Sequence, residues 1–317
     1  MSALGRGRFP SKVKAMKYQD IVPLVNDILG QYTERLTIRQ IYYRLVSPPY
    51  QAFANTKSNY KTLSKILVKA RENGDVDEDR IEDRARTTIG GDHGFDSPTD
   101  LIDYAIRRLE QAYEYYTRKM WDEQDEYIEV WVEKDALASI FSSIANGFRV
   151  ITYPTRGYSS YTLVKEAIKR FDDYNGKPII ILHFADHDPS GLDMTRDIED
   201  RLYKYYDGDF KIKRIALTID QVKKYGLIPN PTKRADARSP KYVAQYGDEC
   251  WELDAIPPNE LRTIIKDAIE EHIDDQIWNE TIDKIEQERK IIKGVLEDER
   301  GSINGLRDRL ISRLAKE

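Results

Sequence analysis

The chain has 317 residues, of which 33% are charged and 40% are hydrophobic, and its net charge at pH 7 is −5. This length suits two modest domains, or one large domain with an appendage. No apolar run approaches the ~20 residues of a membrane span and no signal peptide is visible, so we expect no membrane segment. The single cysteine, Cys250, excludes an internal disulfide and fits a reducing, cytoplasmic location.

Charge is distributed unevenly along the chain. Residues 1–72 hold thirteen Lys and Arg residues against four Asp and Glu residues, a net charge of +9, so the remaining 245 residues carry −14. A basic amino-terminal part joined to an acidic body is typical of a protein that binds nucleic acid through one domain. We therefore expect double-stranded DNA as a partner and a cytoplasmic, nucleoid-associated location.

The first predicted domain covers residues 18–96 and follows a basic flexible arm over residues 1–17. Apolar spacing predicts a helix over 18–32. The sequence Thr37-Ile38-Arg39-Gln40 then matches a capping box, which predicts that a second helix starts at Ile38.

Two adjacent tyrosines on this second helix are predicted to face different ways. Tyr42 shares a face with Ile38, Ile41 and Leu45, so it should pack in the core. Tyr43 lies about 100° further round, on the outer side with Arg39. Periodicity alone therefore predicts a buried Tyr42 and an exposed Tyr43.

A third helix, predicted near residues 59–73, is rich in lysine. Lys57, Lys61, Lys65 and Lys69 recur every four residues on its outer side. Like charges at this spacing destabilise an isolated helix, so the stripe indicates an anionic partner, although a solvated face is the commoner explanation of a lysine-rich helix. Three short helices followed by brief segments near Val76 and Ile81 resemble a winged helix, and we assign the four lysines to DNA binding.

The middle of the chain alternates between predicted strands and helices. A linker near 90–96 and a connecting helix over 97–122 lead to strands at 127–132, 149–153, 178–184 and 211–217. This alternation predicts an α/β domain with a mainly parallel sheet over residues 123–260. It contains a polar, basic loop over 229–247, and a helical segment follows over 261–317.

Acidic residues follow two of these strands. Residues 179–184 form an apolar run typical of a strand buried on both faces, and Asp186 and Asp188 come directly after it. Residues two apart in an extended chain point to the same side, so both carboxylates should face one small volume. Glu133 follows the strand 127–132 in the same manner. Oxygen ligands alone are the set that Mg²⁺ prefers, so these three carboxylates predict a magnesium site. The alternatives are that the aspartates only cap the next helix and that Glu133 only pairs with Lys134.

The arrangement E…D-x-D-P-x-G resembles the toprim domain shared by topoisomerases, primases and some nucleases. With R-Q-I-Y-Y at residues 39–43 ahead of it, the chain resembles the A subunit of topoisomerase VI and its relative, the meiotic double-strand-break protein. The chain is short for an A subunit and resembles the compact, stand-alone A-like proteins of phages and other mobile elements. Arg156-Gly157-Tyr158 corresponds to the family's glycine–aromatic turn after the second toprim strand, whereas Gln40 stands where the family usually has an acid.

The resemblance implies a winged-helix domain followed by a toprim domain, and a DNA-cleaving activity like that of a type IIB topoisomerase A subunit. Tyr43 would be the nucleophile and would become linked to a 5′-phosphate, with Arg39 stabilising the phenolate or the phosphorane. Mg²⁺ at Glu133, Asp186 and Asp188 would assist, and Arg156 would contact DNA. Tyr43 of one protomer would serve the metal site of the other, so we expect a homodimer. An ATPase, if there is one, would be a separate subunit, and we do not expect strand passage by this chain alone.

Two other functions fit the same residues. One is a toprim nuclease in which metal-activated water cuts and Tyr43 only stacks on DNA. The other is a non-catalytic DNA-binding adaptor whose acidic carboxy-terminal helices recruit a partner.

Overall fold

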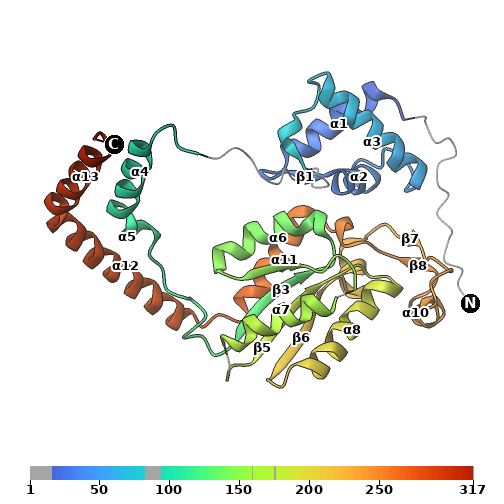
Figure 1. The fold of residues 1–317 in the computed structure, drawn as a ribbon. Helices are drawn as coiled ribbons and strands as arrows, with labels where there is room; N and C mark the ends of the chain where they lie inside the picture. Colours follow the sequence, from blue (N-terminus) through green and yellow to red (C-terminus); the bar gives the residue numbers. More distant parts are fainter. Residues whose placement is uncertain (1–15, 83–93, 159, 175, 317) are drawn as a thin grey trace, which may run out of the picture. The chain divides into compact units, whose positions relative to one another are not determined.

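In a computed structural model of the protein, the described residues are 16–82, 94–158, 160–174 and 176–316 (Figure 1). They belong to two compact units, one of Met1–Arg86 with Glu126–His272 and one of Thr87–Asp125 with Ile273–Glu317. This division differs from the domain boundaries expected at 97, 123 and 261. The amino-terminal helices and the α/β part form one unit, and the residues of the predicted connecting helix belong with the carboxy-terminal helices.

Three helices make up the amino-terminal part: α1 (Tyr18–Gly30), α2 (Ile38–Val46) and α3 (Lys57–Glu72). The capping box predicted for α2 is present. The Thr37 hydroxyl accepts the Gln40 N–H at 3.1 Å, and the Gln40 side chain accepts the Thr37 N–H at 3.0 Å. Because two otherwise unpaired backbone donors are satisfied, α2 begins at Ile38 as predicted.

The predicted winged-helix fold stays a prediction. After a short 3₁₀ turn, η1 (Glu78–Arg80), strand β2 (Ile81–Glu82) pairs in parallel with β1 (Leu36–Thr37). The part of the chain that the structure describes before α4 contains these helices and this parallel pair, and no antiparallel hairpin. Most of the predicted arm and most of the predicted linker lie outside the described residues.

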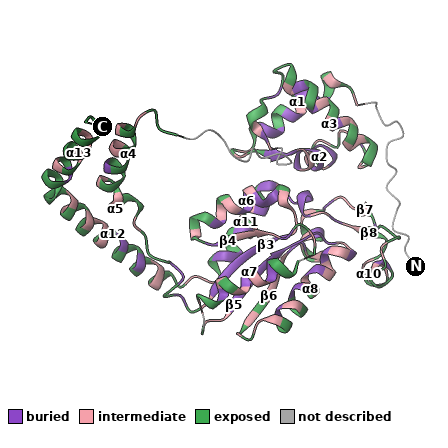
Figure 2. Cartoon of the chain, in the orientation of Figure 1, coloured by how far each residue is buried: buried purple, intermediate pink, exposed green. Residues whose placement is uncertain are grey.

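A four-stranded sheet forms the centre of the α/β part. Its strands are β3 (Tyr127–Val132), β4 (Ile151–Pro154), β5 (Ile179–Phe184) and β6 (Phe210–Ala216). Their order is β4-β3-β5-β6, and every neighbouring pair is parallel, which confirms the predicted parallel sheet. The two central strands, β3 and β5, are buried at every position (Figure 2), which explains their continuous apolar sequences.

Helices cover both faces of this sheet. Figure 1 shows α6 (Ala138–Ala145) and α11 (Pro258–Glu270) on one face and α7 (Tyr161–Asp172) and α8 (Pro189–Tyr205) on the other. A short 3₁₀ turn, η2 (Asp135–Leu137), leads into α6, and η3 (Asn146–Phe148) follows it.

The segment after β6 is more ordered than the predicted loop over 229–247. It contains α9 (Ile219–Tyr225), β7 (Asn230–Pro231) and α10 (Ser239–Tyr246), and β7 pairs with β8 (Glu249–Cys250) in an antiparallel manner. The 3₁₀ turn η4 (Leu253–Ala255) packs against α2. This segment therefore connects the sheet to the helix that carries Tyr43.

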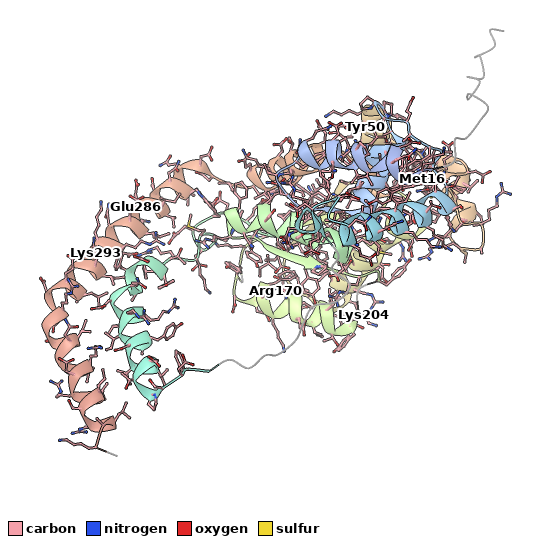
Figure 3. The ribbon with its side chains drawn as sticks, turned by 90° about the horizontal axis from the view of Figure 1, so that it is seen from above. Met16, Tyr50, Arg170, Lys204, Glu286 and Lys293 are labelled. Atoms are coloured by element: carbon pink, nitrogen blue, oxygen red, sulfur yellow. The ribbon has the colours of Figure 1, made fainter. Side chains whose placement is uncertain are left out.

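The second unit consists of α4 (Pro98–Glu110), α5 (Ala112–Tyr115), α12 (Asp275–Asp298) and α13 (Arg300–Leu314). The single connecting helix predicted over 97–122 is wrong, because residues 116–119 are not helical. Glu288 of α12 accepts hydrogen bonds from the Tyr116 hydroxyl at 2.7 Å and from Arg118 Nε at 2.8 Å, which holds this stretch out of the helix. Charged side chains such as Glu286 and Lys293 project from α12 (Figure 3). No helix in the described part of the chain combines the length and the low polarity needed to cross a bilayer.

Candidate functional site

The predicted acidic residues lie where the order of the strands reverses. The chain places β4 on one side of β3 and then β5 on the other, so the carboxyl ends of β3 and β5 flank a topological switch point. Open α/β sheets bind ligands at such points. The Asp186 N–H donates to the Glu133 carboxylate at 3.0 Å, and the Glu133 N–H donates to the Phe184 carbonyl at 2.8 Å. The structure thus brings Glu133 and the D-x-D segment together, as predicted.

A tight turn carries the two aspartates into α8. Asp188 accepts the Gly191 N–H at 2.7 Å and is the N-cap of α8, with Pro189 in the first helical turn. The turn is so close that a Cβ atom added to Gly191 would lie 2.1 Å from the Asp186 carbonyl oxygen. Only glycine fits this position, which gives the P-S-G sequence a steric reason.

Arg214 of β6 fixes the backbone of this turn. Its guanidinium donates to the carbonyl oxygens of Asp186 at 2.7 Å, Ala185 at 3.1 Å and Gly191 at 2.8 Å. Burial lowers the pKa of Arg214 to about 10, against the opposing effect of Glu133, Asp186 and Asp188. Arg214 was not predicted from the sequence, where it is one charged residue in an edge strand.

The Asp186 carboxylate is already paired. It accepts the Leu253 N–H at 2.8 Å and lies 3.1 Å from the Lys134 Nζ. Burial raises the pKa of Asp186 to about 7, and Lys134 opposes this rise. Burial is also the largest cause of the raised pKa of Glu133, to which the charge of Asp188 contributes.

These contacts bear on the predicted magnesium site. Among the described residues, no group of three or more His, Cys, Asp or Glu side chains is positioned to hold a metal ion. Glu133 and Asp188 have no ion pair with a described cation, and their charges act on one another. Carboxylate oxygens suit a hard cation, so Mg²⁺ binding at Glu133, Asp186 and Asp188 stays a proposal.

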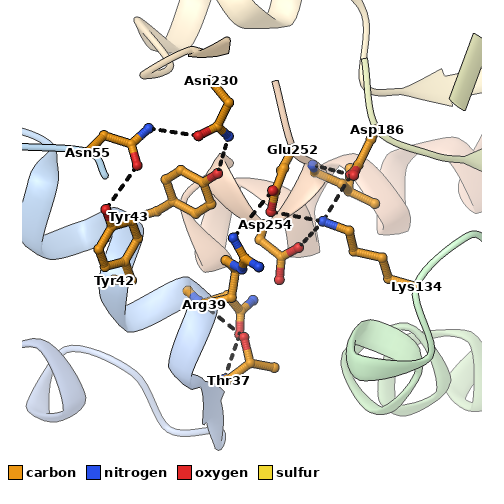
Figure 4. Close-up of polar contacts among 12 residues, drawn as sticks. Thr37, Arg39, Tyr42, Tyr43, Asn55, Lys134, Asp186, Asn230, Glu252 and Asp254 are labelled. Atoms are coloured by element: carbon orange, nitrogen blue, oxygen red, sulfur yellow. Dashed lines mark hydrogen bonds and ion pairs between the residues drawn. The ribbon is translucent and has the colours of Figure 1, made fainter. Parts of the chain in front are cut away.

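Lys134 joins three carboxylates (Figure 4). Its Nζ lies 2.6 Å from Asp254, 3.1 Å from Asp186 and 3.2 Å from Glu252. Glu252 also pairs with Arg39 of α2, at 3.3 Å. The sequence offered a signal for Glu252 and Asp254, since E-L-D has the same spacing as D-H-D. The E-L-D sequence does not follow a predicted strand, so the pattern alone does not indicate a site there.

Tyr43 is 1% exposed, so the prediction of an exposed ring is wrong. Its hydroxyl oxygen accepts a 2.7 Å hydrogen bond from the side-chain amide of Asn230. Helical periodicity gave the correct direction away from the core of the amino-terminal helices. It could not reveal that a segment nearly two hundred positions later covers that side. The burial of Tyr42, 2% exposed, is confirmed.

The two tyrosines are linked by asparagines (Figure 4). The Asn55 side chain donates to the Asn230 oxygen at 3.1 Å and accepts from the Tyr42 hydroxyl at 3.0 Å. This chain of hydrogen bonds fixes the orientation of the Asn230 amide, so that its N–H points at Tyr43.

The surroundings of Tyr43 disfavour the phenolate. Burial raises the pKa of Tyr43 well above its ordinary value, and the charge of Glu252 adds to this effect. Asn230, Lys134 and Arg39 act in the opposite direction. Arg39 also stacks its guanidinium 4.4 Å from the centre of the Tyr60 ring. Lys134 and Glu252 of the same chain thus act on the charge of Tyr43. That Tyr43 of one protomer serves the metal site of the other stays a prediction.

The predicted DNA-binding residues lie on two other surfaces. Lys57, Lys61, Lys65 and Lys69 are all exposed on α3, as predicted. The first three have no ion pair with another described residue, and Lys69 lies 5.6 Å from the centre of the Tyr18 ring. Arg156 has a left-handed backbone (φ 52°) and an exposed side chain that pairs with Asp135 at 3.2 Å. DNA binding by these residues stays a prediction.

Compared with known proteins, the sequence matches no family model and no curated protein. The similarity to the topoisomerase VI A subunit therefore rests on the motifs and their order alone.

Proposed function

We propose that the protein cleaves DNA by transesterification with Tyr43 as the nucleophile, as its resemblance to the topoisomerase VI A subunit implies. The observation that best supports this is the polar network around Tyr43. In it, the phenol oxygen accepts from Asn230, while Arg39 and Lys134 meet at Glu252 and Lys134 also contacts Asp186. A tyrosine, two cations and the strand-end carboxylates thus lie together in one chain.

The proposed reaction exchanges one phosphodiester for another. The Tyr43 oxygen forms a bond to phosphorus, the bond from phosphorus to the 3′-oxygen breaks, and the phenol proton is lost while the 3′-oxygen gains one. Because the Tyr43 pKa is raised, positive charge must stabilise the phenolate, and Arg39 and Lys134 supply it. Mg²⁺ held by Glu133 and Asp188, with Asp186 beside them, would neutralise charge on the phosphate.

DNA is the proposed substrate because the amino-terminal part is basic. Residues 1–72 carry a net charge of +9, and four exposed lysines line α3. Phosphate contacts by lysine and arginine supply most of the affinity of non-specific DNA binding. Cutting both strands of a duplex needs two Tyr43 side chains, so the proposed working form is a homodimer. Strand passage would require a separate ATPase subunit.

A metal-dependent nuclease is the second candidate function. The burial of Tyr43 supports it, since a 1% exposed ring cannot attack DNA unless its cover moves. In this mechanism water attacks the phosphate and no protein–DNA bond forms.

The test is capture of a covalent adduct. Duplex DNA labelled at its 3′ ends is incubated with the protein and Mg²⁺, denatured with detergent, and analysed on a denaturing gel. A labelled band at the size of the protein plus DNA is expected with the wild type and with Tyr42→Phe, and not with Tyr43→Phe. Cutting that leaves no adduct and survives Tyr43→Phe would establish the nuclease instead. DNA binding without any cutting would indicate the adaptor.

A further inference from the structure

Residues 252–255 contact two arginines of α2, the helix that carries Tyr43. Arg39 pairs with the Glu252 carboxylate at 3.3 Å. Arg44 donates to the Ala255 carbonyl oxygen at 2.6 Å. The groups that contact these two arginines are therefore oxygen acceptors, one of them negatively charged.

Arg44 is poorly satisfied in this position. Its Nε is buried without a hydrogen-bond partner, and Arg44 has no ion pair with another described residue. Burial lowers its pKa. A partly buried guanidinium without a counter-ion costs free energy, which an arriving anion would recover. Arg39 shares its carboxylate with Lys134, so the positive charge on α2 is only partly neutralised.

We propose that Arg39 and Arg44 form a phosphate-binding surface for duplex DNA around Tyr43, and that Glu252 and the Ala255 carbonyl occupy this surface in the DNA-free protein. Carboxylate and carbonyl oxygens present the acceptors that phosphate oxygens present, and the planar guanidinium suits phosphate well. The role of Tyr43 in this inference rests on the proposed function, whereas the binding surface does not.

The surface has two features that suit exchange of one anion for another. It lies in the same basic helical part as the lysines, since α2 packs on α3, so one duplex would meet positive charge on both helices. The contacts that close it include hydrogen bonds and an ion pair: Tyr43 with Asn230, Asn55 with the Pro229 carbonyl at 3.0 Å, and Arg39 with Glu252. Polar groups are readily solvated on opening, unlike a purely apolar interface. DNA would therefore compete with residues 252–255 for binding to α2. Tyr43 would become accessible only when DNA has displaced these residues.

The test measures DNA binding and the opening of α2 in a Tyr43→Phe background, in which no covalent step can occur. Glu252→Gln weakens the closed state and leaves the arginines intact. It should raise the affinity for a short duplex about two- to fivefold, the range expected for loss of a partly exposed ion pair. Glu249→Gln is the matched control, because it removes the same charge from an exposed side chain in the same segment. Arg44→Gln should lower the affinity several-fold, whereas Arg35→Gln, on an exposed arginine of the same helical part, should change it little.

Hydrogen exchange reports the opening itself. Addition of DNA should increase exchange at the amides of residues 252–255, which DNA displaces from α2, and Glu252→Gln should increase it without DNA. Equal affinities for the Glu252 and Glu249 variants, together with unchanged exchange at residues 252–255 on DNA binding, would overturn the proposal. If residues 252–255 open on DNA binding but the wild type forms no covalent adduct, the binding surface is supported and Tyr43 is not the nucleophile. Unfolding midpoints of all variants identify any that fail to fold. If Glu252→Gln fails to fold, the DNA affinity of Arg44→Gln, compared with Arg35→Gln, tests the proposal instead.

Discussion

The side-chain amide of Asn230 donates a 2.7 Å hydrogen bond to the hydroxyl of Tyr43, although the two residues are 187 positions apart. Asn55 holds the Asn230 oxygen from the other side at 3.1 Å, so the amide cannot turn away without losing both bonds. This contact brings the proposed nucleophile, on α2, against the α/β part of its own chain. It also makes the hydroxyl a buried group whose removal has a measurable cost.

A double-mutant cycle on this pair should show coupling. Tyr43→Phe and Asn230→Leu should each lower the free energy of unfolding by about 1 kcal/mol, because each leaves a buried polar partner without its hydrogen bond. The double variant should lose less than the sum, with a coupling energy of about 0.5–1.5 kcal/mol. Urea unfolding of the four proteins measures it. Asn259→Leu, on an exposed residue of α11, is the control and should combine additively with Tyr43→Phe. Additivity of the Asn230 pair as well would contradict the contact.

Loss of the Lys134 ammonium should destabilise the protein strongly. Lys134→Met leaves Asp186, Glu252 and Asp254 without their common cation, and breaking such a buried pair costs about 3–5 kcal/mol. Mg²⁺ should raise the thermal midpoint of this variant more than that of the wild type, because a bound cation would reduce the repulsion among the three carboxylates. Lys266→Met, which removes an exposed lysine, should behave like the wild type in both measurements. An Mg²⁺ response no larger than that of the wild type would argue against cation binding at these carboxylates.

Acid should destabilise the protein partly through His183. Burial, with a contribution from Arg214, lowers the pKa of His183 from 6.5 to about 3. The unfolded chain binds this proton near pH 6.5 and the folded protein does not, so the associated stability is present above pH 6.5 and is lost as the pH falls toward 3. The expected slope is about 1.4 kcal/mol per pH unit within that window.

His183→Leu isolates this effect from those of other titrating groups. The difference in unfolding free energy between the wild type and this variant should change with pH below 6.5 at the slope given above. Loss of the hydrogen bond between His183 and Thr195, which measures 2.9 Å, shifts the difference by a constant amount at every pH. Parallel stability curves for the two proteins from pH 7 to pH 4 would show that His183 is protonated in the fold.

The lysines of α3 should set the salt dependence of DNA binding. Lys61→Ala combined with Lys65→Ala should weaken binding and reduce the slope of log affinity against log salt by about 0.9 for each DNA phosphate that the variant no longer neutralises. The control pair is Lys223 and Lys224 of α9, which are likewise two exposed lysines of one helix. A fluorescence anisotropy titration at several salt concentrations compares the two. Equal slopes for both double variants would remove α3 from the DNA-binding surface.

The sequence was sufficient where local chemistry decides the structure. The capping box at Thr37 and Gln40 placed the start of α2 correctly, because its two hydrogen bonds lie within one turn. The apolar runs before Glu133 and Asp186 predicted two buried parallel strands, because both faces of a central strand must be covered. The carboxylates at their ends could then be placed together from topology alone.

Contacts between distant segments were beyond the reach of periodicity. The periodicity of α2 alone predicts an exposed Tyr43, whereas Asn230 covers it. Lys134 gave no sign of its three partners, two of which follow a short β8 strand that has no clear sequence signature. The non-helical stretch after α5 likewise depends on Glu288, which lies in another helix of the second unit.

Arg214 gives the D-x-D turn a property that is unusual for a connection between a strand and a helix. Its guanidinium donates hydrogen bonds to three carbonyl oxygens of residues 185–191, so side-chain bonds to the neighbouring strand hold the turn. Backbone amides of this turn should therefore relax like those of the sheet on the picosecond-to-nanosecond timescale, with NMR order parameters near the ~0.85 of rigid backbone. Asp186 and Asp188 would then keep a fixed backbone position, and any motion at this site would come from the segments packed against it, such as residues 252–255.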